Sequence, residues 1–228
     1  MNINIIHDAK DATGIAIIID VFRAFTVEPY VINNGAKKLI PVGDKEIAYN
    51  LKENNKDYIL IGERHGIKLP GFDYGNSPAQ IKEVDFFDKV VVHTTSCGTQ
   101  GIVNAVNAKE IITGSLVNAE AISRYIKKGK YEDVSIVSLS KPGELPFDED
   151  ELCAQYIKSL LENKQFENIE EEIEKLKLTS GKRFFDKTME DISPEEDFYL
   201  CTELNKFNFV LRVNKDFNGM MYMEKIEV

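Results

Sequence analysis

The sequence predicts an α/β protein in which a largely parallel or mixed sheet carries helices on both faces. Three apolar runs, Ile15–Ile19, Tyr58–Ile61 and Val90–Val92, lack polar alternation, which is typical of strands buried on both faces. Strand and helix patterns alternate up to Glu162, an order that favours such a sheet. Because ligands of these sheets collect beyond the carboxyl ends of the strands, the polar residues that follow the three runs predict one shared site.

The other elements of the core are expected in chain order. A short helix should cover Pro29–Asn34, because proline is tolerated in a first helical turn and Gly35 can end the helix. Asp44 should cap a helix that runs to about Lys52, and Ser77 one that runs to about Glu83. The alternation further predicts strands at Lys38–Val42, Ile111–Thr113 and Val134–Leu139, and helices at Ile102–Asn107, Asn118–Lys128 and Asp150–Glu162.

The composition changes near Asn163. The Glu- and Lys-rich segment Glu167–Lys177 is typical of a solvated helix face, and a further helix is expected to begin at Ser193-Pro194. Phe207–Val213 and Met220–Ile226 predict a closing β-hairpin. We therefore expect an α/β core over residues 1–162 that carries the site, and a C-terminal extension over residues 163–228 that packs on it.

Charge and composition exclude several classes of protein. A net charge of -10 argues against nucleic acid as a partner, because its binding requires a basic face. No run approaches the roughly 20 apolar residues that cross a bilayer, and Met1–Lys10 has no signal-peptide pattern, so we expect a cytoplasmic protein without a membrane partner. Three cysteines in no metal-like spacing indicate neither a disulfide framework nor a zinc site. A homodimer is compatible with the sequence, which does not set the oligomeric state.

The strand ends carry groups suited to a phosphate or metal–phosphate site. Asp20 offers the carboxylate oxygens that Mg²⁺ prefers, although it could instead cap the next helix. Arg23 could bind a phosphate or sulfonate through its forked donors, or could pair with Asp20. Gly62–Gly66 places Glu63, Arg64 and His65 between two glycines, more polar groups than a plain turn requires. The acidic run Asp148–Asp150 could add metal ligands or could only cap a helix.

Two loops resemble anion-binding segments in form. Ser77 begins a helix after a glycine-rich stretch, and free N–H groups at a helix start can receive an anion. Thr94–Gly101 combines hydroxyl side chains with glycines but lacks the Gly-Lys-Ser/Thr ending of a Walker loop. A cysteine phosphatase requires an arginine six residues after its nucleophile, whereas Val103 stands there after Cys97. The paired aspartates of haloacid-dehalogenase-type phosphatases are missing as well, since Asp20 is followed by Val21 and Phe22.

Short motifs occur in a fixed order from about Asp20 to Glu162: Ile18–Thr26 (IIDVFRAFT), Gly62–Gly66 (GERHG), Gly71–Pro78 (GFDYGNSP), Thr94–Gly101 (TTSCGTQG), Gly114–Ala119 (GSLVNA) and Glu149–Ala154 (EDELCA). Together they resemble the 2-phosphosulfolactate phosphatases. The resemblance implies a magnesium-dependent phosphoric monoester hydrolase of α/β fold. Such an enzyme converts 2-phospho-3-sulfolactate to 3-sulfolactate and phosphate, a step of coenzyme M biosynthesis.

The residues that match the family pattern can be given roles from their chemistry. We expect Asp20, Arg23, Glu63 and Arg64 to act in catalysis. Mg²⁺ should be held by Asp20, Glu149 and Asp150. The small anionic substrate should be bound by Asn76, Ser77, Thr94, Thr95, Ser96, Gly98, Thr99 and Asn118.

The chain departs from the family pattern at two places. Many members read Thr-Thr-Asn-Gly-Thr-Arg in the motif that contains Cys97 here, and this chain has Gln100 in place of the arginine. The helix after Arg23, usually threonine-rich, carries Glu28. These changes keep two alternatives open, a phosphatase for another phosphorylated carboxylic acid and a non-catalytic anion-binding protein. A thiol enzyme that uses Cys97 is a third alternative.

Overall fold

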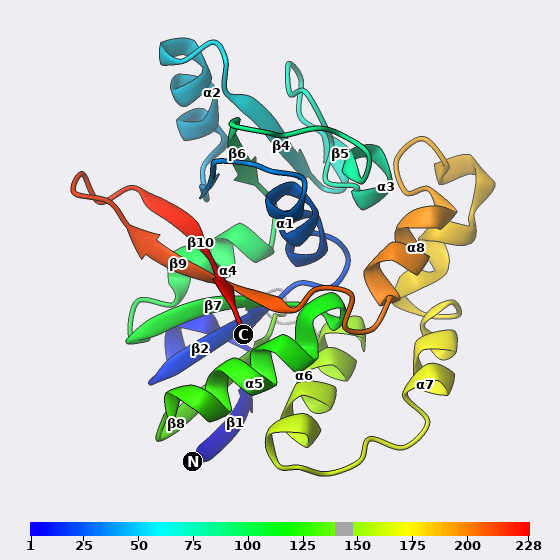
Figure 1. The fold of residues 1–228 in the computed structure, drawn as a ribbon. Helices are drawn as coiled ribbons and strands as arrows, with labels where there is room; N and C mark the ends of the chain where they lie inside the picture. Colours follow the sequence, from blue (N-terminus) through cyan, green and yellow to red (C-terminus); the bar gives the residue numbers. More distant parts are fainter. Residues whose placement is uncertain (140–147) are drawn as a thin grey trace.

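The computed structural model describes residues 1–139 and 148–228, and within them ten strands form one mixed sheet (Figure 1). Their order across the sheet is β1 (Asn2–Ile6), β8 (Asp133–Ser138), β2 (Ile15–Ile19), β7 (Glu110–Gly114), β9 (Phe209–Lys215), β10 (Met221–Glu227), β3 (Lys38–Pro41), β6 (Val90–Thr94), β4 (Ile59–Arg64) and β5 (Ile67–Lys68). The predicted α/β class with a mixed sheet is confirmed.

The sheet consists of two parallel groups joined by the C-terminal hairpin. Strands β1, β8, β2 and β7 are parallel to one another, and so are β3, β6 and β4. Strand β9 pairs antiparallel with β7, and β10 pairs antiparallel with both β9 and β3. The hairpin expected at the end of the chain is therefore present, and it lies between the two groups, a place that its position in the sequence did not indicate.

Helices cover both faces of the sheet. In β2 the side chains of Ile15, Ile17 and Ile19 pack in the hydrophobic cluster that includes α5 (Ala119–Gly129) and α6 (Asp148–Leu161). Ala16 and Ile18 face the opposite cluster, which includes α1 (Ala24–Asn33) and α4 (Gly98–Asn104). All five side chains are fully buried, which explains why this strand shows no polar alternation.

The remaining helices are α2 (Lys45–Asn54), α3 (Pro78–Ile81), α7 (Ile169–Leu176) and α8 (Glu195–Thr202), with short 3-10 helices at η1 (Ala9–Asp11), η2 (Leu116–Asn118), η3 (Ser180–Phe185) and η4 (Lys187–Met189). Asp44 caps α2 as expected, since its side chain accepts a hydrogen bond from the Glu46 N–H at 3.0 Å. In the described part of the chain, no helix has both the length and the apolar character needed to cross a lipid bilayer.

Helices α1, α3 and α4 have limits that differ from the expected ones, and those of α5 and α6 differ by one or two residues at each end. Helix α1 begins at Ala24, not at Pro29, because the Asp20 side chain accepts a hydrogen bond from the Ala24 N–H and its backbone carbonyl accepts one from Phe25. Pro29 therefore lies inside the helix. Helix α4 begins at Gly98 rather than Ile102, so it starts within the hydroxyl-rich loop, and α3 ends at Ile81.

Candidate active site

A cavity of about 320 Å³ lies where β2, β4 and β6 end. The structure brings together in its wall many of the residues singled out in the sequence, namely Asp20, Arg23, Glu63, Asn76, Ser96, Glu149 and Asp150. His65, Gly66 and Cys97, which belong to two of the motifs, also line it. Although β2 belongs to one parallel group and β4 and β6 to the other, their carboxyl ends contribute to the same cavity.

Three buried carboxyl groups determine the electrostatics of the cavity. Asp20, Glu149 and Asp150 are 8%, 4% and 2% exposed. Burial raises the pKa of each of them, that of Asp20 to about 6, and the charges of neighbouring carboxylates add to the increase. Asp150 accepts a hydrogen bond from the Val21 N–H at 2.8 Å. The buried Oε2 of Glu149 has no hydrogen-bond partner among the described residues.

This group of carboxylates could provide ligands for a divalent cation, although the side chains do not form a complete coordination sphere. Over residues 1–139 and 148–228, no three His, Cys, Asp or Glu side chains are placed to hold one ion together. Magnesium usually binds through one or two carboxylates and keeps waters or substrate phosphates as its other ligands. A cation would offset the repulsion among the three carboxylates and would give Glu149 Oε2 a partner. The donor set is therefore compatible with Mg²⁺.

Glu63 holds two loops together at the cavity wall. Its carboxylate accepts hydrogen bonds from the Gly66 N–H at 2.7 Å, from the Ser96 N–H at 2.6 Å and from Ser96 Oγ at 3.0 Å. The turn after β4 is thus fixed to the loop after β6. These contacts occupy the carboxylate and give Glu63 a positioning role.

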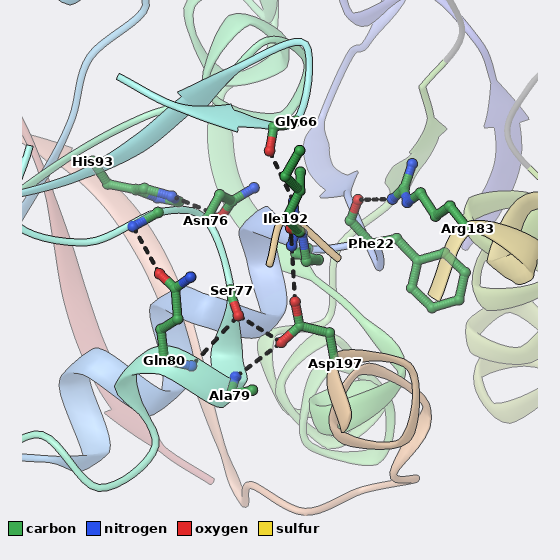
Figure 2. Close-up of polar contacts among 12 residues, drawn as sticks. Phe22, Gly66, Asn76, Ser77, Ala79, Gln80, His93, Arg183, Ile192 and Asp197 are labelled. Atoms are coloured by element: carbon green, nitrogen blue, oxygen red, sulfur yellow. Dashed lines mark hydrogen bonds and ion pairs between the residues drawn. The ribbon is translucent and has the colours of Figure 1, made fainter. Parts of the chain in front are cut away.

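Arg23 forms a buried ion pair beside the cavity. Its Nη1 donates to Asp197 Oδ2 at 2.8 Å and to the Ile192 carbonyl at 2.7 Å, so its ion-pair partner is Asp197 and not Asp20. Asp197 Oδ1 also accepts from Ser77 Oγ at 2.8 Å and from the Ala79 N–H at 2.9 Å (Figure 2). Ser77, expected to bind substrate, is directed towards Asp197 instead.

Arg64 and Thr94, also expected in the site, form hydrogen bonds outside the cavity lining. Arg64 donates to Thr94 Oγ1 at 3.0 Å, to the Gly43 carbonyl at 3.0 Å and to the Glu63 carbonyl at 2.7 Å. Neither Arg64 nor Thr94 lines the cavity. Their contacts anchor the end of β4 to the end of β6, the strand pair that presents Glu63.

Three further candidates, Thr95, Thr99 and Asn118, are buried and bind local backbone. The Thr95 N–H donates to Thr99 Oγ1 at 2.9 Å, and the Thr99 N–H donates to Thr95 Oγ1 at 3.2 Å. Asn118 Oδ1 accepts from the Ser115 N–H at 3.1 Å. These side chains shape the loop and the start of α5, and they are not among the residues lining the cavity.

Gly98 and Gln100 occupy different surroundings in the first turn of α4. A Cβ added to Gly98 would lie 2.7 Å from Asp20 Oδ2 and 2.9 Å from Ala24 Cβ, so a glycine permits the close approach of α4 to Asp20. Gln100, which replaces the arginine of many family members, donates to the Gly43 carbonyl at 2.5 Å, away from the cavity-lining set. Glu28 is likewise buried against His93 and does not line the cavity.

Residues from the last third of the chain complete the cavity and were missed in the sequence. Arg183 of η3 lines the wall together with Met189, Ile192 and Ser193, and its Nη2 donates to the Phe22 carbonyl at 3.1 Å (Figure 2). Asp197 of α8 was also missed. One signal was available for Arg183, because the acidic chain has few arginines and this one lies in a segment rich in lysine.

Comparisons with known proteins identify one family. The family described as 2-phosphosulpholactate phosphatase matches residues 3–216. Curated relatives from several organisms carry the name "Probable 2-phosphosulfolactate phosphatase". The protein of Bacillus subtilis (strain 168) is 33% identical over 213 residues, which cover 92% of this chain and 91% of the relative. The protein of Clostridium tetani (strain Massachusetts / E88) is 40% identical over 164 residues, covering 69% and 70%.

The third relative, from Caldanaerobacter subterraneus subsp. tengcongensis, is 29% identical over 235 residues, which cover 94% of this chain and 96% of the relative. The family match over residues 3–216 thus includes Arg183, which lines the cavity, and Asp197, which pairs with Arg23. The agreement of motifs and full-length similarity leaves one assignment. This chain belongs to the 2-phosphosulfolactate phosphatase family.

Proposed function

We propose that this protein is a phosphatase that hydrolyses 2-phospho-3-sulfolactate to 3-sulfolactate and phosphate with the help of Mg²⁺. The observation that carries the proposal is the single cavity in which three buried carboxyl groups meet two arginines, Arg23 and Arg183. The names of the curated relatives support the same reaction. A volume of about 320 Å³ suits a small organic acid, because it lies near the lower end of the usual range of ligand pockets.

The chemistry of the substrate explains why both signs of charge are present. Phosphoryl transfer needs little covalent chemistry from the protein, so positioning and charge neutralisation supply most of the catalysis. Asp20, Glu149 and Asp150 would hold Mg²⁺, which when bound supplies positive charge to the phosphoryl oxygens. Arg183 is exposed at the cavity and can bind an anionic group of the substrate. Glu63 keeps the turn Glu63–Gly66 and the loop at Ser96 in place around the reacting group.

An assay of phosphate release tests the proposal with two matched substrates. 2-Phospho-3-sulfolactate should be hydrolysed at least about tenfold more efficiently than 2-phospholactate, which has the same skeleton without the sulfonate. Activity should disappear in EDTA and return with Mg²⁺. Asp20→Asn should abolish it, whereas Asp57→Asn, a change at an exposed carboxylate, should leave it unchanged.

The other outcomes separate the alternatives. Equal hydrolysis of both substrates would favour a phosphatase for phosphorylated carboxylic acids in general. Binding without any release of phosphate would favour a non-catalytic anion-binding protein. Full activity in excess EDTA would contradict the assignment of the carboxylates to a metal.

A further inference from the structure

Buried hydrogen bonds connect Asn76 to His93 and His93 to Glu28. His93 Nδ1 is 3.0 Å from Glu28 Oε1, and His93 Nε2 is 3.2 Å from Asn76 Oδ1, the second contact being drawn in Figure 2. Glu28 and His93 are fully buried and Asn76 is 6% exposed. The three residues come from α1, β6 and the segment before α3. This hydrogen-bond network reaches the cavity because Asn76 lines it.

The hydrogen-bond partners determine how many protons Glu28 and His93 share. A carbonyl oxygen can only accept, so the Asn76 Oδ1 contact places a hydrogen on Nε2 of His93. The contact between Nδ1 and Glu28 then requires one more proton, which sits either on the imidazole or on the carboxyl group. In both cases Glu28 and His93 together have no net charge. Loss of a proton would leave a net negative charge in a fully buried place, which is costly.

The surroundings of the pair agree with the neutral state. Thr113 Oγ1 donates to Glu28 Oε2 at 3.4 Å, and His93 occupies Oε1, so both carboxyl oxygens have partners. Burial raises the pKa of Glu28, which opposes loss of the shared proton. With its oxygen bound to His93, Asn76 has its amide nitrogen directed away from the imidazole in Figure 2.

We propose that the Glu28–His93 pair fixes the orientation of the Asn76 amide, so that its NH₂ group faces the cavity and donates to an oxygen of an anionic substrate. This inference rests on the proposed function for the identity of the anion. In the opposite orientation the carbonyl oxygen of Asn76 would face the anion, replacing an attraction with a repulsion. Asn76 contacts the substrate, whereas Glu28 and His93 are positioning residues.

The first test examines the pair without any ligand. Nitrogen-15 NMR of the ligand-free protein reports which imidazole nitrogen of His93 carries hydrogen, and the signals are assigned by their loss in His93→Gln. We expect a protonated Nε2 between about pH 6 and pH 8. A neutral ring with hydrogen on Nδ1 alone would overturn the proposal, because Asn76 would then have to turn its NH₂ group towards His93.

The second test measures the binding of inorganic phosphate by calorimetry. Asn76→Asp can still accept from Nε2 but offers no donor, and Asn76→Ala removes the donor without adding charge. Both should bind phosphate at least about tenfold more weakly than wild type, with thermal unfolding used to confirm that they are folded. Wild-type affinity in the folded Asn76→Ala protein would overturn the proposal.

Substitutions at Glu28 separate orientation from simple packing. Glu28→Leu should weaken phosphate binding to a similar extent, because Nδ1 loses its partner. Glu28→Gln should regain most of the lost affinity, since its NH₂ group can donate to Nδ1 and thereby keep the hydrogen on Nε2. If Glu28→Gln binds as weakly as Glu28→Leu, the proposal is wrong. Wild-type protein that binds no phosphate would instead count against the proposed function, and the NMR result would then decide the orientation alone.

Discussion

Arg23 and Arg183 line the same cavity, but their guanidinium groups are held differently. Arg23 is 4% exposed and donates to Asp197 and to backbone carbonyls, so its charge is largely matched within the protein. Arg183 is exposed and donates to the Phe22 carbonyl. Loss of one partner from a buried arginine–carboxylate pair destabilises the fold, whereas an exposed arginine in a cavity can exchange water for a ligand.

Substitution of the two arginines should therefore give different results. Arg23→Met should lower the free energy of unfolding by about 3–5 kcal/mol, because it leaves Asp197 buried without its partner. Arg183→Met should keep its thermal stability and raise KM at least about tenfold. Thermal denaturation and steady-state kinetics measure the two effects. Arg124→Met, which removes a surface ion pair with Glu120, is the control and should change neither the stability nor KM. A normal KM in Arg183→Met would exclude a role of Arg183 in substrate binding.

The raised pKa of Asp20 predicts how stability depends on pH. An aspartate has a pKa near 3.9 in an unfolded chain, and burial raises that of Asp20 to about 6 in the fold. The folded state therefore binds the proton more tightly, so the contribution of Asp20 is greatest below about pH 4 and is lost as pH rises through about 6. The loss should be on the order of 2–3 kcal/mol without a bound cation.

A comparison with Asp20→Asn isolates this contribution. Asparagine cannot ionise and can keep the hydrogen bond to the Ala24 N–H. In EDTA, we expect the variant to become more stable relative to wild type as pH rises from about 4.5 to 8, measured by thermal or denaturant unfolding. A stability difference that does not change with pH would show that Asp20 is not held at a raised pKa.

At the scale of single elements, the strands and the starts of α2 and α3 could be predicted, but the starts of α1 and α4 could not. Strands β2, β4 and β6 are buried on both faces, so their runs of β-branched residues are sufficient signals. The sequence predicts a start of α1 at Pro29 because proline is a strong local signal for a first helical turn. The observed start at Ala24, whose N–H donates to Asp20, depends on how the chain turns after β2. Local preference and tertiary structure disagree there, at a residue of the candidate site.

The start of α4 gives a test of how closely an element must approach the site. Gly98→Ala should lower kcat at least about a hundredfold with little loss of fold, because the new Cβ would meet Asp20 Oδ2 at 2.7 Å and displace the carboxylate or the helix. Gly75→Ala is a matched control, since its Cβ would meet the flexible end of Gln80 at 3.1 Å. Full activity in Gly98→Ala would mean that Asp20 need not be held at this position.

Over the whole molecule, the cavity lies between parts of the chain that are far apart in sequence. Asp20 follows β2 of one parallel group, Glu63 ends β4 of the other, and Arg183 belongs to η3. Each strand end carries its own local signal, so convergence at one site could be predicted from the sequence. The pairing of Arg23 with Asp197 could not, because no periodicity or motif relates residues 174 positions apart.

The position of the hairpin predicts that residues 1–162 do not fold alone. Without β9 and β10, the edges of β7 and β3 lose their antiparallel partners, and the two parallel groups lose their connection. Arg23 would also lose its ion-pair partner Asp197 and the Ile192 carbonyl. We expect a fragment of residues 1–162 to show poorly dispersed amide NMR signals and no phosphatase activity, and both should improve when residues 163–228 are added as a separate peptide. A well-dispersed spectrum from the fragment alone would show that it is an independent domain and that the hairpin is an addition to a complete core.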